Sequence, residues 1–295
     1  MFATLLGPLP RPPLADDVAS EALLDAVLEL QVQHGLEPLT DAGWALDRED
    51  PVSAWQATAG RTDRLVKAVL DGPFTSGRPA AEVRAVLLGL ADAGCGWIEV
   101  HEPAATGIGS DADERARFMD AHATLTADLG ADVHLSLAIT GGSANTAGIE
   151  TIRAGAYASL AVDLIDGPDN WRLATAWPAD RGLICGALST LEGSDDGPEL
   201  LLWAARYAAS TRGRGPSRVG LATAGSLAGL SWPVAAEKVR RLGEAARVAA
   251  APHDEALAAI DPRAVDKRSA ALGRYEPDAS RPGGRRRRAT PGQET

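Results

Sequence analysis

Short apolar runs alternate along the chain with longer segments in which apolar residues recur every three or four positions. The short runs are typical of buried strands, and the spacing of three and four is typical of helices with one buried face. The pattern predicts eight strands, at residues 3–6, 36–40, 65–70, 97–100, 133–139, 159–165, 182–188 and 219–223. Between them it predicts crossover helices, most clearly at residues 81–93, 111–129, 198–210 and 234–249.

This alternation favours an α/β fold with a parallel sheet. Some predicted strands, such as "VHLSLAI" at 133–139 and "GLICGAL" at 182–188, are apolar on both faces. That is the pattern of a sheet covered by helices on the outside and packed with side chains inside. Eight strand-helix units in about 250 residues predict a single (β/α)8 TIM-type barrel. An open, doubly wound sheet is the alternative.

The composition changes near residue 250, which divides the chain into three predicted parts. Residues 1–250 would form the barrel, and residues 251–277 a short docking helix or extension. From residue 278 onward proline, glycine and charge leave nothing to bury, so we expect a disordered basic tail containing Arg285 to Arg288. Such a run could contact acidic surfaces, but a solvated tail is the simpler interpretation.

Charge and composition narrow the function classes. The formal net charge is -11, which gives little attraction to nucleic acid outside the tail. No segment approaches the roughly 20 apolar residues that span a bilayer. Cys95 and Cys185 lie in apolar segments without metal-ligand spacing. We therefore expect both to be core residues of a protein in a reducing cytoplasm. We therefore expect a soluble, cytoplasmic protein with a small-molecule substrate. The oligomeric state stays open.

Polar residues gather where the predicted strands end. Catalytic groups of such barrels collect at the carboxyl ends of the strands. The stretch "GWIEVHEP" ends in this way on His101 and Glu102. The other candidates at or near strand ends are Asp41, Lys67, Thr75, Thr140, Asp163, Asp166 and Ser189. Trp44 follows the second predicted strand, where it would either form the wall of a site for a flat ligand or pack in a small core.

Five short motifs stand in order along the chain: "TLLGPLPRP" from Thr4, "LEPLTDAGW" from Leu36, "KAVLDGPFTSG" from Lys67, "GWIEVHEPA" from Gly96 and "GLATAGSLAGLSWPVAAEKVRRL" from Gly220. Together they resemble the catalytic domain of the cobalamin-independent methionine synthases over residues 4–249. None of the motifs is specific alone. The resemblance implies a barrel of the kind shared with uroporphyrinogen decarboxylase. It also implies chemistry at the carboxyl ends of the strands and a folate-type methyl donor as the candidate cofactor.

The same resemblance implies a zinc ion that activates a thiol, yet the ligand positions carry other residues here. The family's His-x-Cys falls on Ala138 and Thr140, or, in a shifted register, on His134 and Ser136. The closing cysteine corresponds to glycine, and only Asp163 matches a ligand. One carboxylate does not hold zinc. We therefore expect no metal site of the family type.

Each of the main candidate residues has a predicted role and an alternative. The resemblance points His101 into the pocket as an acid or base near neutral pH; otherwise it bonds a loop carbonyl. Glu102 either orients substrate or braces a loop. Lys67, if buried, would pair with Asp163 and Glu102 or bind an acidic ligand; otherwise it reaches solvent. Asp163 lies within an apolar strand and needs a partner.

Three functions remain open on the sequence. The leading hypothesis is methyl transfer, or a related reaction, on a small amino-acid-like or folate-like substrate. In that hypothesis His101, Asp163 and Glu102 are catalytic, and the remaining candidates bind substrate. The second is a metal-free lyase or decarboxylase of the uroporphyrinogen decarboxylase type. The third is a non-catalytic barrel that binds a metabolite or a partner protein.

Overall fold

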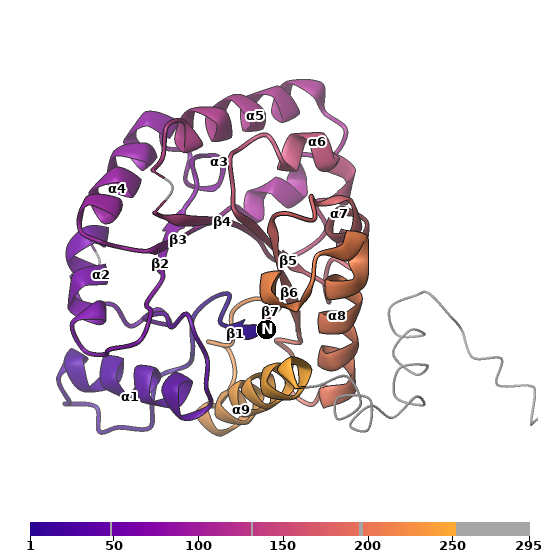
Figure 1. The fold of residues 1–295 in the computed structure, drawn as a ribbon. Coiled ribbons are helices and arrows are strands. Elements are labelled where there is room, and N and C mark those ends of the chain that lie inside the picture. The colour runs from indigo at the N-terminus through magenta and orange to yellow at the C-terminus, as the bar shows by residue number, and fades with distance from the viewer. Residues whose placement is uncertain (48, 131, 195–196, 252–295) are drawn as a thin grey trace, which may run out of the picture.

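Seven parallel strands form one curved sheet in a computed structural model that describes residues 1–47, 49–130, 132–194 and 197–251 (Figure 1). The order across the sheet is β1-β7-β6-β5-β4-β3-β2, so each strand except β1 and β2 lies between neighbours. The strands are β1 Phe2–Thr4, β2 Ala68–Asp71, β3 Trp97–His101, β4 His134–Ile139, β5 Ser159–Asp163, β6 Gly182–Leu188 and β7 Val219–Thr223.

Helices follow the strands and cover the outside of the curved sheet (Figure 1). They are α1 Ser20–Gln33, α2 Pro51–Ala59, α3 Pro73–Ser76, α4 Ala80–Asp92, α5 Ala112–Thr126, α6 Ile149–Ile152, α7 Asn170–Ala176, α8 Pro198–Ser210 and α9 Trp232–Ala250. Short 3-10 turns stand at Pro103–Gly107, Asn145–Ala147, Thr211–Gly213 and Pro216–Arg218. The sequence pattern therefore predicted the α/β class and the parallel sheet correctly.

The predicted strand at residues 36–40 is not a strand, so the expectation of eight strands is not met in the described residues. Leu39 makes a single parallel bridge with Val66. On the other side the Glu37 N–H donates to the Ala3 carbonyl at 2.8 Å. Pro38 has no N–H to contribute to a ladder. The segment thus joins the two edge strands of the sheet by isolated hydrogen bonds.

The two faces of the sheet pack differently. A large core of leucine, valine and alanine lies between the sheet and the helices. A second, small core on the inner face consists of Leu6, Ala138, Ala161, Ile184 and Ala222, with Phe2 and Trp97 against it. Successive strand residues alternate between faces, so residues two positions apart share the inner face. This alternation decides which polar side chains meet there.

Several predicted bounds change in the structure. The third predicted strand, 65–70, begins later and runs over Ala68–Asp71, and the strand predicted at 159–165 ends at Asp163, where its carboxylate begins to bind the following loop. The helix predicted at 111–129 ends at Thr126. The predictions for residues 252–277 and 278–295 lie outside the described residues. Within the described part, no helix has the length and apolar character needed to cross a membrane.

Candidate active site at the carboxyl ends of β2 and β3

Three side chains meet on the inner face and form what we call the lumen array: Lys67, Glu99 and His101. Lys67 directly precedes β2, and the other two lie two positions apart on β3. Glu99 Oε1 accepts from Lys67 Nζ at 2.7 Å and lies 2.8 Å from His101 Nε2. Lys67 also donates to the Leu5 carbonyl at 2.9 Å. The array therefore links β1, β2 and β3 across the inner face.

The charges of the array depend on one another because Lys67 and Glu99 are fully buried. Burial acts to raise the pKa of Glu99, but the charge of Lys67 and the hydrogen bond from His101 outweigh it and lower this pKa to about 2. Burial lowers the pKa of Lys67 below its ordinary value, while Glu99 opposes that shift. The short contact between the two favours the ion pair. Glu99 is therefore ionised at neutral pH.

His101 is the member of the array that reaches solvent, because its side chain is 13% exposed. Its Nε2 is held by Glu99, and its Nδ1 makes no hydrogen bond to the described residues. A carboxylate on one ring nitrogen fixes the orientation of the imidazole. The other nitrogen can then accept or donate a proton.

Ser136 and Trp97 contact the lumen array from the side nearer the start of the strands. The indole Nε1 of Trp97 can only donate, and it lies 3.1 Å from Ser136 Oγ. The Ser136 hydroxyl is in turn 3.4 Å from Glu99 Oε2. His134, at the start of β4, packs against Trp97 with 3.9 Å between ring centroids and 39° between the ring planes, and it contacts Ser159 Oγ at 2.9 Å. This imidazole belongs to the opposite end of the inner face from His101.

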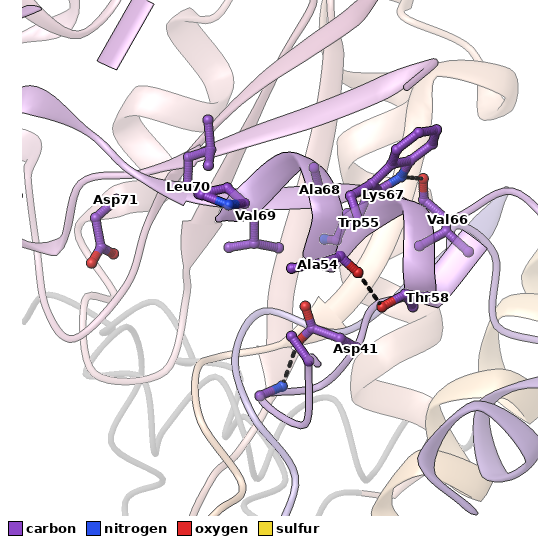
Figure 2. Close-up of a pocket in the computed structure, with 13 residues that line it drawn as sticks. Asp41, Ala54, Trp55, Thr58, Val66, Lys67, Ala68, Val69, Leu70 and Asp71 are labelled. Atoms are coloured by element: carbon purple, nitrogen blue, oxygen red, sulfur yellow. Dashed lines mark hydrogen bonds between the residues drawn. The ribbon is translucent and has the colours of Figure 1, made fainter. Parts of the chain in front are cut away.

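A cavity of about 430 Å³ opens beside β2 (Figure 2). Its walls come from residues 66–71 on one side, from Asp41, Gly43 and Ala45 on the other, and from α2. Lys67 and Asp71 both line it. Asp71 is exposed and is the register partner of His101 in the β2–β3 ladder. The cavity therefore runs along β2 between this strand and α2, and Lys67 is the member of the lumen array that lines it.

Glu102 points to the helix layer rather than to the array. Its carboxylate accepts the N–H groups of Phe74 at 2.9 Å and Thr75 at 2.6 Å, at the start of α3. His122 Nε2 lies 3.1 Å from the same carboxylate, and His122 Nδ1 lies 2.5 Å from the Tyr157 hydroxyl. The two N–H contacts brace the turn after β2, and His122 joins the same carboxylate to α5. Glu102 and Lys67 are thus not partners, although the sequence had allowed that pair.

Asp163 binds the loops that follow β4 and β5. Its two oxygens accept the N–H groups of Gly141 at 3.2 Å, Ile165 at 2.8 Å and Asp166 at 3.0 Å. Burial raises its pKa, while those three N–H groups oppose the shift. Asn170, also buried, donates to the carbonyls of Gly142 at 2.9 Å and Asp163 at 2.7 Å. Asp163 holds these loops and does not contact Lys67, contrary to the other predicted pair.

The remaining predicted site residues are spread around the same end of the sheet. Asp41 accepts from the Gly43 N–H at 2.6 Å and lines the cavity. Trp44 donates to the Leu9 carbonyl at 3.1 Å and packs against the main core. The Thr75 hydroxyl accepts from the Ala104 N–H at 3.2 Å. Thr140 is half-buried, and its Cβ is 4.0 Å from a Cβ built on Gly225.

Two further residues complete the set. Asp166 is exposed after β5, and its N–H is held by Asp163. Ser189 is buried after β6 and accepts the Leu191 N–H at 3.1 Å. Of the predicted residues, the structure therefore links Lys67 and His101 through Glu99, and Asp41 lines the same cavity as Lys67. The others hold loops around them.

Sequence reasoning missed Glu99 and Asp71. Glu99 lies inside an apolar strand and was overlooked among candidates taken from strand ends. A signal existed, because residues two positions apart on a strand share a face. From His101 this spacing leads back to Glu99, and from Lys67 it leads forward through Val69 to Asp71.

Most positions that the resemblance assigns to zinc carry residues that are not usual metal ligands. Among the described residues, no three side chains of His, Cys, Asp or Glu are grouped so that they could hold a metal. Of the corresponding positions, Asp163 alone carries a carboxylate in the natural register, and its oxygens already accept three backbone N–H groups. We therefore assign no step to zinc.

No family model matches the chain, and a sequence search finds no match among curated proteins. Solved structures are similar in fold. A B12-independent methionine synthase from Shewanella sp. W3-18-1 aligns with a TM-score of 0.71 at 14% identity, covering 87% of this chain and 98% of that one. A Listeria monocytogenes protein assigned as a vitamin-B12-independent methionine synthase gives 0.65 at 14% identity, with 84% and 97% covered.

A second kind of enzyme barrel is also similar. Dihydrodipicolinate synthase from Acinetobacter baumannii, solved with pyruvate, aligns with a TM-score of 0.55 at 13% identity, covering 88% of this chain and 79% of that chain. At these identities the likeness concerns the fold. The chain shares the TIM-barrel-like fold of methionine synthase and dihydrodipicolinate synthase structures.

Proposed function

We propose that the chain is a barrel enzyme that performs acid–base chemistry on a small amino-acid-like or folate-like substrate. The observation that carries this proposal is the lumen array, in which a partly exposed imidazole is held by a buried, ionised carboxylate. An imidazole in that setting suits proton transfer near neutral pH. His101 lies at the carboxyl end of β3, and barrel enzymes hold their substrates at this end of the strands.

Each member of the array has its own role. His101 accepts a proton from the substrate through Nδ1 while Nε2 stays on Glu99. The carboxylate of Glu99 stabilises the imidazolium that forms, as the buried aspartate does in the serine-protease triad. Lys67 keeps Glu99 ionised by contact at 2.7 Å. Lys67 and Glu99 therefore position and tune His101 and need not touch the substrate.

Methyl transfer is the reaction that the fold similarity supports. In that reaction His101 removes the proton from the substrate nucleophile, the nucleophile bonds to the methyl carbon, and the bond to the donor breaks with its electron pair remaining on the donor. A folate-type donor is the cofactor that fits this proposal. Because the zinc positions are not filled by suitable donors, the proton would go to an imidazole.

A metal-free lyase or decarboxylase is the second candidate. The same imidazole and carboxylate would serve it, and no methyl donor is needed. The fold similarity to dihydrodipicolinate synthase supports this second candidate. The two candidates differ in one respect that can be measured, because only the first requires a methyl donor for turnover.

The test begins with thermal shifts of the whole protein across folates, amino acids and thiols, because a ligand that binds the native state raises the apparent stability. Turnover of the ligands found is then compared in His101→Asn and His134→Asn. We expect His101→Asn to reduce turnover by about 100-fold or more, the usual contribution of a general acid or base. His134→Asn is the matched control and should retain turnover, since that imidazole lies at the other end of the sheet.

Equal turnover in the two variants would contradict the role of His101. Stoichiometric zinc in the purified protein, together with activity on homocysteine, would contradict the metal-free site. Turnover that depends on a folate donor would select methyl transfer, and turnover without any methyl donor would select the lyase.

A further inference from the structure

A second cavity, of about 410 Å³, opens at the amino end of the inner face, opposite the end that carries His101. Its lining includes the first residue of five strands: Phe2 of β1, Trp97 of β3, His134 of β4, Ser159 of β5 and Gly182 of β6. Arg218, directly before β7, also lines it. We call it the amino-end cavity. Its volume falls within the roughly 300–1,000 Å³ of small-molecule sites.

Small residues leave this layer of the barrel open. The interior of a TIM-type barrel is usually filled by layers of bulky side chains. Here β6 contributes Gly182 and β7 contributes Gly220. The ring of Phe2 takes the place of a side chain at Gly220, since a Cβ there would lie 2.5 Å from a ring carbon. Gly182 instead lines the cavity, and its register partner Ser159 carries only a hydroxymethyl group. The layer at the amino end is therefore incompletely filled.

The walls of the amino-end cavity are largely aromatic and apolar. Phe2 and Trp97 pack edge to face with 5.5 Å between ring centroids, and both are half-buried, so part of each ring stays open to the cavity. Ile184 of β6 lies beside them. His134 Nε2 and Ser159 Oγ contact each other at 2.9 Å and are already paired. An aromatic ligand group suits such walls, because aromatic rings prefer offset or edge-to-face partners.

Two opposite charges line the same cavity. Arg218 and Asp180 are both exposed, and neither side chain makes an ion pair with the described residues. Arg218 donates to the Arg214 carbonyl at 3.3 Å. The buried guanidinium of Arg214 in turn donates to the carbonyls of Pro178, at 2.8 Å, and of Arg181, on either side of Asp180. Arg214 therefore anchors both segments that carry the charges.

The two charges select the head group of a ligand. Burial lowers the pKa of Arg214, and the charges of Asp180 and Arg218 act on this pKa in opposite directions, so both lie near the same guanidinium. A purely anionic ligand would be repelled by Asp180, and a purely cationic ligand by Arg218. An amino acid carries a carboxylate and an ammonium group on one carbon. It can therefore face both side chains at once.

We infer that the amino-end cavity binds a free α-amino acid with an aromatic side chain, whose carboxylate faces Arg218, whose ammonium group faces Asp180 and whose ring lies against the aromatic wall. This site goes beyond the proposed function. It lies at the other end of the inner face from His101, and it does not depend on acid–base chemistry there.

The experiment uses the full chain, labelled with 15N, and L-phenylalanine as the probe. The indole N–H resonance of Trp97, assigned by its loss in Trp97→Phe, should shift in a saturable way, because the ligand ring lies beside this indole. L-alanine lacks the ring and should bind about tenfold more weakly or worse. 3-Phenylpropanoate lacks the ammonium group, and phenethylamine lacks the carboxylate. Each should bind about three- to tenfold more weakly, since solvent screens the exposed partners.

Two charge variants separate the two ends of the zwitterion. Arg218→Gln should weaken L-phenylalanine and 3-phenylpropanoate by about three- to tenfold, but not phenethylamine. Asp180→Asn should weaken L-phenylalanine and phenethylamine by a similar factor, but not 3-phenylpropanoate. Arg172→Gln on α7 and Asp92→Asn on α4 are the matched controls. Both replace exposed charges that do not line the cavity, and they should leave all three affinities unchanged.

Any of three results would overturn the inference: no saturable shift of Trp97, unchanged affinity for L-phenylalanine in both charge variants, or 3-phenylpropanoate that binds as tightly as L-phenylalanine. The proposed function is tested separately, by the turnover of His101→Asn. Loss of turnover in that variant, with no shift of Trp97 in the titration, removes only the amino-end site. Retained turnover with a saturable shift removes only the acid–base role.

Discussion

Lys67 and Glu99 show at the scale of single residues how a buried charge pair maintains a catalytic group. Neither side chain reaches solvent, and each supplies the opposite charge that the other needs. A buried ion pair gives little net stability compared with an apolar pair, but removal of one partner is costly because the other charge stays buried. The pair therefore fits a role in tuning His101 better than a role in stability alone.

The pKa of Glu99 predicts an acid-sensitive contribution to folding. This pKa is about 2 in the folded protein, against about 4.3 for a free glutamate. As the pH falls, the unfolded chain therefore takes up a proton on Glu99 at a higher pH than the folded protein does. The contribution is complete above about pH 4.3 and declines as the pH falls from there toward about 2. Urea unfolding of the wild type from pH 6 to pH 3 should show this loss. Lys67→Met/Glu99→Leu, which lacks both charges, should lose less stability over that range.

The single variant Lys67→Met provides the comparison at neutral pH. It leaves Glu99 buried without its cation and should lower the free energy of unfolding by about 3–5 kcal/mol. The double variant should recover most of that loss. A double variant as unstable as Lys67→Met, or with the full acid sensitivity of the wild type, would argue against the buried ion pair.

At the scale of elements, one glutamine holds the segment that follows α1. Gln31 joins α1 to the segment before α2 through both peptide groups of Thr40, and it also donates to the Val27 carbonyl of its own helix at 3.0 Å. Leu39 pairs with the β2 side, so the N–H and C=O of Thr40 point away from β2 and would lack partners without these bonds. The position of this segment therefore depends on α1 as well as on the bridge between Leu39 and Val66.

Gln31→Leu should destabilise the protein by about 1–3 kcal/mol for each buried group left without a partner. Gln33→Leu is the control on the same helix; that side chain is exposed, and its replacement should change stability by less than about 0.5 kcal/mol. Urea unfolding of both variants measures the difference. Similar stability of the two variants would mean that Thr40 does not depend on Gln31.

At the scale of the whole molecule, the ring of helices is completed where α9 lies against the end of α1 (Figure 1). Gly243 of α9 approaches His34 so closely that a Cβ built there would overlap the His34 carbonyl oxygen. The end of the first helix and the last helix therefore meet backbone to backbone, because Gly243 has no side chain to separate them. α9 also packs against β1, and the carbonyl of Leu5, directly after β1, accepts from Lys67.

Gly243→Ala should therefore cost about 1–3 kcal/mol through overpacking, even though alanine has the higher helix propensity. Gly229→Ala is the matched control, since a Cβ there meets nothing within 4 Å. Thermal unfolding of the two variants checks the prediction. A Gly243→Ala variant as stable as Gly229→Ala would show that α1 can move away from α9 without cost.

Hydrophobic periodicity was sufficient to predict the α/β class, the parallel sheet and most element positions. It failed at residues 36–40, where "LEPLT" has a strand-like composition but Pro38 lacks a donor and Gln31 captures Thr40. That competition involves a residue from another element, so no window around the segment reveals it. The same local pattern also placed His101 correctly at the end of β3.

The sequence by itself determined which residue types stand at strand ends, because the period of two and the turn residues are local properties. It did not determine which of them would meet. Glu99 rather than Asp163 or Glu102 holds Lys67, because β2 and β3 are neighbours in one register and their inner faces coincide. Partners of buried charges are chosen by the arrangement of strands in space. The tertiary structure alone decided that arrangement, since desolvation makes each buried charge depend on the nearest opposite one.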